Sequence, residues 1–138
     1  MTANDNPPGG VPGGARQGAP DCDSAAACVR PEFGLVVVYA TFPSRDAALT
    51  CGKLMVEAHL AGCINVLAGM TSVYIWEGRT ETTDEAVLIA KCAREKAEAA
   101  VDFIVRSHTY EVPAVLVLPV SGGNPAYVNW LRGGTSLL

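Results

Sequence analysis

The hydrophobic and polar positions of the chain repeat with changing periods from residue 33 onward. LVVVYAT, residues 35–41, is a continuous apolar run, which is typical of a strand buried on both faces. Apolar side chains then recur every three or four positions, which predicts an amphipathic helix that begins after Ser44, a good N-cap residue, and ends near Gly62. The predicted apolar face of this helix consists of Ala47, Cys51, Leu54, Met55, Ala58 and Ala61.

The period of the pattern then becomes two, as in strands with two different faces. INVLAGMTSVYIWEG, residues 64–78, and EAVLIAKC, residues 85–92, predict a long hairpin that turns near Gly78. In the first of these strands, Tyr74 and Trp76 are expected on the face opposite to Val73 and Ile75.

The last third of the chain predicts a helix, a strand and a short final helix. An apolar stripe at helical spacing covers residues 94–107 and reaches His108, residues 112–120 read as a strand, and Asn124 and Pro125 are typical residues for a helix start. The order of elements predicts an α+β fold: a ferredoxin-like βαββαβ sandwich with an extra C-terminal helix and a long hairpin. Two helices should cover one face of the sheet and leave the other face bare and apolar.

Residues 1–32 have a different composition, rich in proline and glycine as in PPGGVPGG. They have no periodic apolar face, so we expect a flexible extension that is dispensable for folding. The folded domain is predicted to comprise residues 33–138.

The composition changes this picture in three ways. The chain has 138 residues, enough for one domain, and its 49% of hydrophobic and 17% of charged residues are more apolar than one small domain can bury, which favours a homo-oligomer. A net charge of −4 argues against nucleic-acid binding, and no apolar run is long enough to span a membrane. The five cysteines cannot all pair and no export signal is visible, so we expect free thiols in the cytoplasm.

Five stretches together resemble the CutA family of divalent-cation tolerance proteins. They are VEAHLAGCINV, SVYIWEG, LIAKC, SHTYEVPAVLVLPV and GNPAYVNWL, and they occur in the family's order between residues 35 and 131. The resemblance implies a ferredoxin-like fold and a tight homotrimer whose hairpins reach across neighbouring sheets. It also implies binding of copper or another divalent metal and no established enzymatic turnover.

The stretch HTYEVP, residues 108–113, raises the question of a site. In the resemblance, Lys91 faces a cleft between subunits near His108 and Tyr110, so the predicted ligand cleft contains Lys91, His108, Tyr110, Glu111 and Glu57. Each residue also has a structural interpretation. His108 could cap and pack a helix end, Lys91 could be an edge lysine with a buried stem, and Glu57 could belong to a solvated face.

The metal prediction depends on His108 and Cys63. The positions that match copper ligands reported in the family are Ala40, Ser107 and His108, and only the last is a ligand type. We therefore expect weak copper(II) binding anchored at His108, with Cys63 as a possible soft donor or simply a buried small residue. The aromatic residues predicted to lie in the trimer interface are Tyr74, Trp76, Tyr127 and Trp130.

Two other kinds of function stay open at this point. Trimeric signalling proteins of the P-II class bind small ligands between subunits, although no glycine-rich phosphate loop is present here. An acylphosphatase-like enzyme would use the loop FPSRDA, where Ser44 and Arg45 precede a helix and could hold a phosphate.

Overall fold

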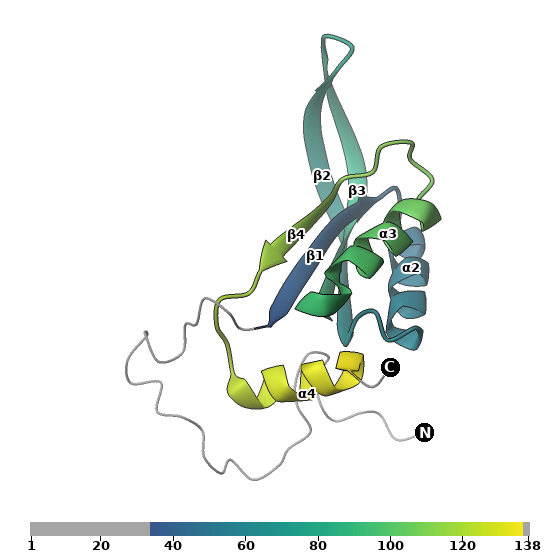
Figure 1. The fold of residues 1–138 in the computed structure, drawn as a ribbon. Helices are drawn as coiled ribbons and strands as arrows, with labels where there is room; N and C mark the ends of the chain where they lie inside the picture. The colour runs from purple at the N-terminus through teal and green to yellow at the C-terminus, as the bar shows by residue number, and fades with distance from the viewer. Residues whose placement is uncertain (1–33, 137–138) are drawn as a thin grey trace.

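The computed structural model describes residues 34–136, so the predicted extension over residues 1–32 lies outside the described residues. The elements of the described chain are β1 (Leu35–Phe42), α2 (Arg45–Glu57), β2 (Cys63–Trp76), β3 (Arg79–Ala93), the 3-10 turn η1 (Arg94–Lys96), α3 (Ala97–Ser107), β4 (Val115–Pro119) and α4 (Pro125–Ser136) (Figure 1). This order confirms the predicted succession of strands and helices. No helix among these elements is long and apolar enough to cross a membrane.

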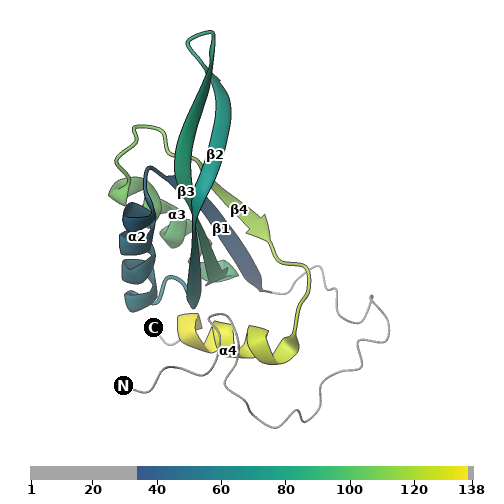
Figure 2. The same ribbon diagram turned by 180° about the vertical axis from the view of Figure 1, so that it is seen from behind.

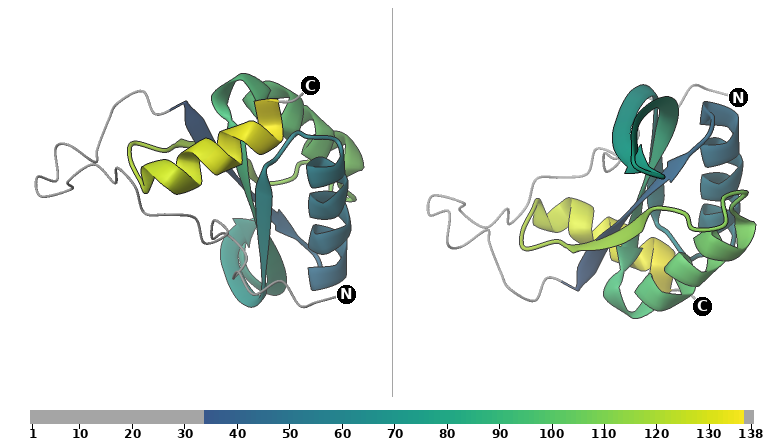
Figure 3. Two further views of the ribbon diagram at one scale, coloured as in Figure 1. Left: turned by 90° about the horizontal axis from the view of Figure 1, so that it is seen from below. Right: turned by 90° about the horizontal axis from the view of Figure 1, so that it is seen from above.

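The four strands form one antiparallel sheet in the order β2-β3-β1-β4. Helices α2 and α3 cover one face of this sheet, and α4 crosses the end of the sheet at which β1 begins (Figures 1 and 2). The view from below shows α4 lying across this end, away from the projecting hairpin (Figure 3). The protein therefore has one layer of two helices, α2 and α3, on one layer of sheet, and α4 covers only one end of that sheet.

The main core lies between the sheet and the two covering helices. Every second residue of β1 faces the helices and is buried, and the partners of these residues on β3 are buried beside them. The central members of this core are Val36, Val38, Ala40, Phe42, Met55, Leu88, Ala90, Cys92 and Ile104.

Helix α2 begins as predicted but buries a different face. The Ser44 hydroxyl accepts a hydrogen bond from the Ala47 amide at 3.1 Å, which is the predicted N-cap. Leu54, predicted to be buried, is 47% exposed, whereas Gly52 is buried. A Cβ added at Gly52 would stand 2.8 Å from the Ile64 side chain, so the glycine lets α2 approach the sheet closely and sets the buried face.

Two predicted boundaries are wrong by several residues, and the second helix, which covers its predicted range, begins with a different kind of turn. Helix α2 ends at Glu57 rather than near Gly62, because His59 takes a left-handed conformation with φ of 58°. The second helix starts with a 3-10 turn before α3. Strand β4 begins at Val115 rather than at residue 112, because residues 109–112 form the bends of a turn and Pro113 has no N–H group for a ladder.

The hairpin of β2 and β3 carries one extra residue on β2. Leu67 pairs with Val87, but the next pair joins Met70 to Glu85, so a bulge separates the two registers. Gly69 lies in this bulge with φ of 79°. Since one extra residue exchanges the two faces of a strand, the even-numbered residues beyond the bulge lie on the same side as the odd-numbered residues before it.

The bulge therefore directs Tyr74 and Trp76 to the side of the sheet that α2 and α3 leave uncovered. A contact supports this assignment, because the hydroxyl of Tyr39, on the uncovered face of β1, donates to the Met70 sulfur at 3.6 Å. We call the hairpin beyond the bulge, residues 70–85, the arm. Figure 1 shows the arm projecting beyond the rest of the sheet.

The uncovered face is apolar along β4 and half-buried near α4. Leu116 and Leu118 are 60% and 49% exposed on this face. At the other end Leu35 is buried by Val128 and Leu131 of α4. The prediction of a bare apolar face is thus confirmed for the β4 side and wrong where α4 packs, because α4 carries an apolar stripe of its own.

Candidate functional site

His108 lies directly after α3 and makes two hydrogen bonds with its ring. Its Nε2 is 2.6 Å from the carbonyl oxygen of Thr41, and its Nδ1 accepts from the backbone N–H of Tyr110 at 3.0 Å. A carbonyl oxygen can only accept, so Nε2 carries the proton and the ring is the neutral Nε2–H tautomer. The ring also stacks on Phe42, with centroids 4.5 Å apart. The histidine therefore fixes the turn after α3 to the end of β1.

Tyr110 extends this arrangement to β3. Its ring lies 4.7 Å from the His108 ring, and its hydroxyl donates to Glu85 Oε2 at 3.2 Å. Burial raises the pKa of Tyr110, and the hydrogen bond and negative charge of Glu85 raise it further. We call this set, Thr41, Phe42, Glu85, His108 and Tyr110, the histidine cluster.

The geometry of the histidine cluster bears directly on metal binding. A metal ion could bind His108 only by replacing one of its two hydrogen bonds, because both ring nitrogens are engaged. Among residues 34–136 no group of three or more His, Cys, Asp or Glu side chains could hold a metal ion. One described chain by itself thus does not fit a copper centre.

Lys91 forms a second cluster with Tyr127. Its Nζ donates to the Tyr127 hydroxyl at 3.1 Å and lies 5.3 Å from the centre of the tyrosine ring. Burial raises the pKa of Tyr127, the hydrogen bond from Lys91 partly opposes this, and the nearby Cys63 thiol adds to the rise. Cys63 is the cross-strand partner of Lys91. We call Lys91, Tyr127 and Cys63 the lysine cluster.

The two clusters lie at different ends of β1. Lys91 pairs with Val37 near the start of the strand, whereas His108 bonds to Thr41 near its end. Four residues of strand separate these positions by about 13 Å. Within one chain the predicted ligand cleft is therefore two separate groups, and His108 with Tyr110 is the part that the structure brings together.

The remaining predicted residues are not members of either cluster, although Trp130 contacts the lysine cluster. Glu111 and Glu57 are exposed, and within the described residues no hydrogen bond or ion pair joins Glu57 to Lys53. Tyr74 and Trp76 are 42% and 63% exposed on the arm. Trp130, 42% exposed, stacks on Tyr127 with centroids 5.9 Å apart.

The cysteines of the core are not candidate ligands. Burial raises the pKa of Cys92 to about 12 and that of Cys51 to about 11. Metal ions bind the thiolate, and a thiol with so high a pKa is almost fully protonated at neutral pH. Cys63 is the only half-exposed thiol in residues 34–136.

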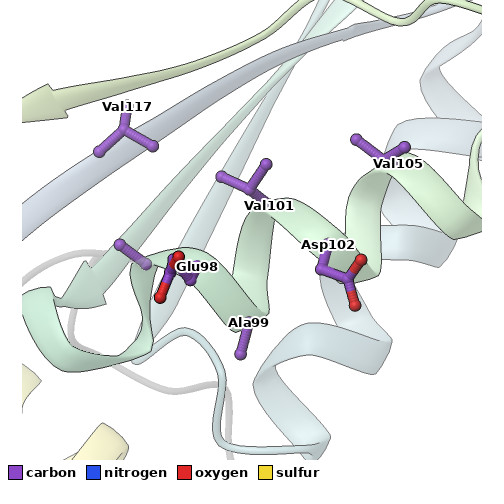
Figure 4. Close-up of a pocket in the computed structure, with 7 residues that line it drawn as sticks. Glu98, Ala99, Val101, Asp102, Val105 and Val117 are labelled. Carbon is purple, nitrogen blue, oxygen red and sulfur yellow. The ribbon is translucent and has the colours of Figure 1, made fainter.

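A broad hollow of about 680 Å³ lies between α3 and β4, away from both clusters. It is lined by Ala97, Glu98, Ala99, Val101, Asp102, Val105 and Val117. In Figure 4, Val101 and Val105 project from α3 to the side on which Val117 lies, and Ala99 projects to the opposite side. Among the described residues of this lining there is no histidine, cysteine or lysine, and Glu98 and Asp102 are its only charged groups.

The loop before α2 does not form a phosphate cradle. The Ser44 hydroxyl is engaged as the N-cap, and the Arg45 guanidinium lies 3.5 Å from Asp46. An acylphosphatase-like reaction gains no support from this geometry.

Known proteins match most of the described chain. A family model described as CutA1 divalent ion tolerance protein matches residues 36–133. The divalent-cation tolerance protein CutA of Thermus thermophilus is 36% identical over 99 residues, which cover 72% of this chain and 96% of that protein. The chloroplastic protein CutA of Arabidopsis thaliana is 37% identical over 100 residues, which cover 72% of this chain. This match spans only 55% of the length of the Arabidopsis protein.

Solved structures agree with these matches. The crystal structure of CutA1 from Oryza sativa superposes with a TM-score of 0.71 at 37% identity, covering 73% of this chain and 93% of the other. The Thermus thermophilus divalent cation tolerance protein gives a TM-score of 0.70 at 36% identity, covering 73% and 98%. The α+β fold with its four-stranded antiparallel sheet is that of the CutA1 structures, and the chain belongs to the CutA1 divalent ion tolerance family.

Proposed function

We propose that this protein takes part in the response to divalent metal ions as a homotrimer that binds a metal ion or a small ligand between its subunits, without turnover. Its chain would form a ferredoxin-like sandwich, since the strand order β2-β3-β1-β4 with two helices on one face is typical of that fold. The family and the relatives named for divalent-cation tolerance supply the physiological setting.

One observation carries the proposal: the uncovered sheet face and the aromatic side of the arm point the same way. Leu116 and Leu118 on β4, and Tyr74 and Trp76 on the arm, are large, exposed and apolar. Apolar side chains gathered on one side of a small protein mark an interaction surface. A closed ring of identical chains would bury this surface on every copy and leave no free edge strand.

The separation of the two clusters supports ligand binding between subunits. The lysine cluster lies on the uncovered face near the start of β1, and the histidine cluster lies at the other end of β1, where Glu85 is on the uncovered side. A neighbouring chain packed on this face would border both. Glu111 and Glu57 are exposed carboxylates that could contribute donors to such a cleft. We expect copper(II) to bind weakly, because imidazole and several well-placed donors must be gathered from more than one chain.

The cytoplasm remains our predicted location. Cys51, Cys63 and Cys92 are free thiols in the structure, which suits a reducing compartment. Relatives are named for other compartments, as in the chloroplastic protein of Arabidopsis thaliana and the periplasmic protein of Archaeoglobus fulgidus.

Light scattering tests the assembly. The expected mass is three times the chain mass of 14.4 kDa. Trp76→Ala should weaken the assembly by about 2–4 kcal/mol, as for a large aromatic at the centre of an interface. Val105→Ala removes an apolar residue that is 43% exposed on the covered side of the sheet, and it should leave the mass unchanged. A stable monomer of the wild-type chain would end the proposal.

A copper(II) titration tests the ligand part. Weak binding in the wild type should fall in His108→Ala and in Trp76→Ala, since the proposed cleft needs both the imidazole and the neighbouring chain. Cys63→Ala should leave copper(II) affinity unchanged and lower only the affinity for copper(I), a soft ion. Tight binding that survives His108→Ala would refute an inter-subunit site anchored at this residue.

A further inference from the structure

A small pocket of about 200 Å³ opens beside the lysine cluster, between β1, α4 and the segment that precedes α4. Its volume would hold roughly seven water molecules at their liquid density. The apolar part of its lining consists of Leu35, Val36, Val37, Val120, Val128 and Leu131. Among the described residues Lys91 is the only charged one that lines the pocket, and Tyr127 brings the hydroxyl group bonded to it.

Lys91 has no counter-charge among residues 34–136. It is half-buried, its only hydrogen-bond acceptor within residues 34–136 is the neutral Tyr127 hydroxyl, and no carboxylate in that part of the chain forms an ion pair with it. A charge that is partly removed from water is stabilised by an opposite charge or by several hydrogen bonds. The pocket thus offers an unneutralised cation beside an apolar wall.

The backbone around the pocket favours an anion as well. Gly122 and Gly123 line it without side chains, so a ligand can approach the main chain there. The N-terminal end of α4 starts at Pro125, next to these glycines, and a helix N-terminus carries partial positive charge. A metal cation is disfavoured here, because the Lys91 ammonium group would repel it.

We propose that this pocket binds a small organic anion, a carboxylate with a short apolar body, whose charged end takes hydrogen bonds from Lys91 and Tyr127. A body of about four carbon atoms fits the volume. The proposal gives the small ligand of the proposed function a chemical class, yet it needs only residues of one chain and no metal ion.

Butyrate is a suitable probe, with butyramide as its neutral counterpart of nearly equal size. Trp130 stacks on Tyr127, so its fluorescence reports on the pocket. Titrating the full-length protein with sodium butyrate at constant ionic strength should give a saturable change with a dissociation constant on the order of 1 mM, as is usual for so small a ligand. Butyramide should bind at least about tenfold more weakly, because it lacks the charge.

Lysine variants distinguish binding in this pocket from a general effect of removing a positive charge. Lys91→Met keeps an unbranched side chain that is one atom shorter and removes the charge, so it should weaken butyrate binding at least about tenfold, whereas Lys91→Arg should keep it. Lys53→Met removes an exposed lysine on α2 and should bind as the wild type does. If Lys91→Met does not fold, the ratio of butyrate to butyramide affinity in the wild type and in Lys91→Arg still decides the matter.

Three results would overturn the inference: no saturation by butyrate, equal affinity for butyramide, or unchanged affinity in a folded Lys91→Met protein. Its failure is distinguishable from failure of the proposed function. Butyrate binding by a monomeric protein would support the anion pocket and refute the proposed trimer. A trimer that binds copper but not butyrate would support the proposed function and refute the anion pocket.

Discussion

His108 allows a test that separates its two ring nitrogens, because two amide side chains each replace one of them. The amide of glutamine reaches the position of Nε2, so His108→Gln should keep the bond to the Thr41 carbonyl. The amide oxygen of asparagine reaches the position of Nδ1, so His108→Asn should keep only the bond from the Tyr110 N–H.

The expected magnitudes differ because the two partners differ in burial. Thr41 is 7% exposed, so a carbonyl there left without a donor costs about 1–3 kcal/mol. The Tyr110 N–H can bond to water instead, since Tyr110 is 39% exposed. Both variants lose the stacking on Phe42, about 0.5–1.5 kcal/mol. We expect His108→Asn to lose about 2–4 kcal/mol of unfolding free energy and His108→Gln about 1 kcal/mol.

Urea unfolding at one fixed protein concentration measures these losses, because the stability of an oligomer depends on concentration. Glu111→Gln is the matched control in the same turn. Glu111 is exposed and its side chain makes no hydrogen bond within the described residues, so the change should stay within about 0.5 kcal/mol. If His108→Asn proved more stable than His108→Gln, the assignment of the proton to Nε2 would be wrong.

Three further predictions concern the core and the arm. The pKa of Cys92 is raised from 9.0 to about 12 in the fold, so its stabilising contribution is complete below pH 9 and is lost as the pH rises toward 12. Between pH 8 and pH 10 this loss is about 1 kcal/mol, and urea unfolding of Cys92→Ala should show a pH dependence weaker by that amount. Gly52→Ala should lower the unfolding free energy by about 1–3 kcal/mol in the same assay, because its Cβ meets the Ile64 side chain; an unchanged stability would show that α2 shifts freely. Deleting Gly69 removes the bulge and turns Trp76 to the opposite face, so light scattering should show smaller particles. An unchanged mass would show that assembly does not depend on the side that Trp76 faces.

The local features of the fold could be predicted from the sequence, because their signals lie within a few residues. The cap at Ser44, the turn at Gly78 and the start of α4 at Asn124 and Pro125 each depend on neighbouring atoms, and all three are confirmed. The buried face of α2 could not be predicted in the same way. A glycine adds nothing to an apolar stripe, although its missing side chain decides how closely α2 approaches the sheet.

The candidate site shows the same limit more strongly. His108 and Tyr110 could be found because they are chemically distinctive and lie two residues apart. Their partner Thr41 acts through a backbone carbonyl that lies 67 residues away from His108, and a carbonyl leaves no trace in the identity of its residue. The bond between Lys91 and Tyr127 joins residues 36 positions apart, so only the folded chain reveals that they meet.

The bulge in β2 also constrains how the length of this protein can change over evolutionary time. One inserted or deleted residue in the arm would exchange its two faces and present Val73 and Ile75 where Tyr74 and Trp76 now lie. A matched change of one residue on each strand beside the tight turn at Glu77 and Gly78 keeps the pairing and leaves Tyr74 and Trp76 on their present side. Length variants that retain the aromatic side should therefore change by equal numbers of residues on the two strands beside the turn, or should carry a second bulge that restores the parity.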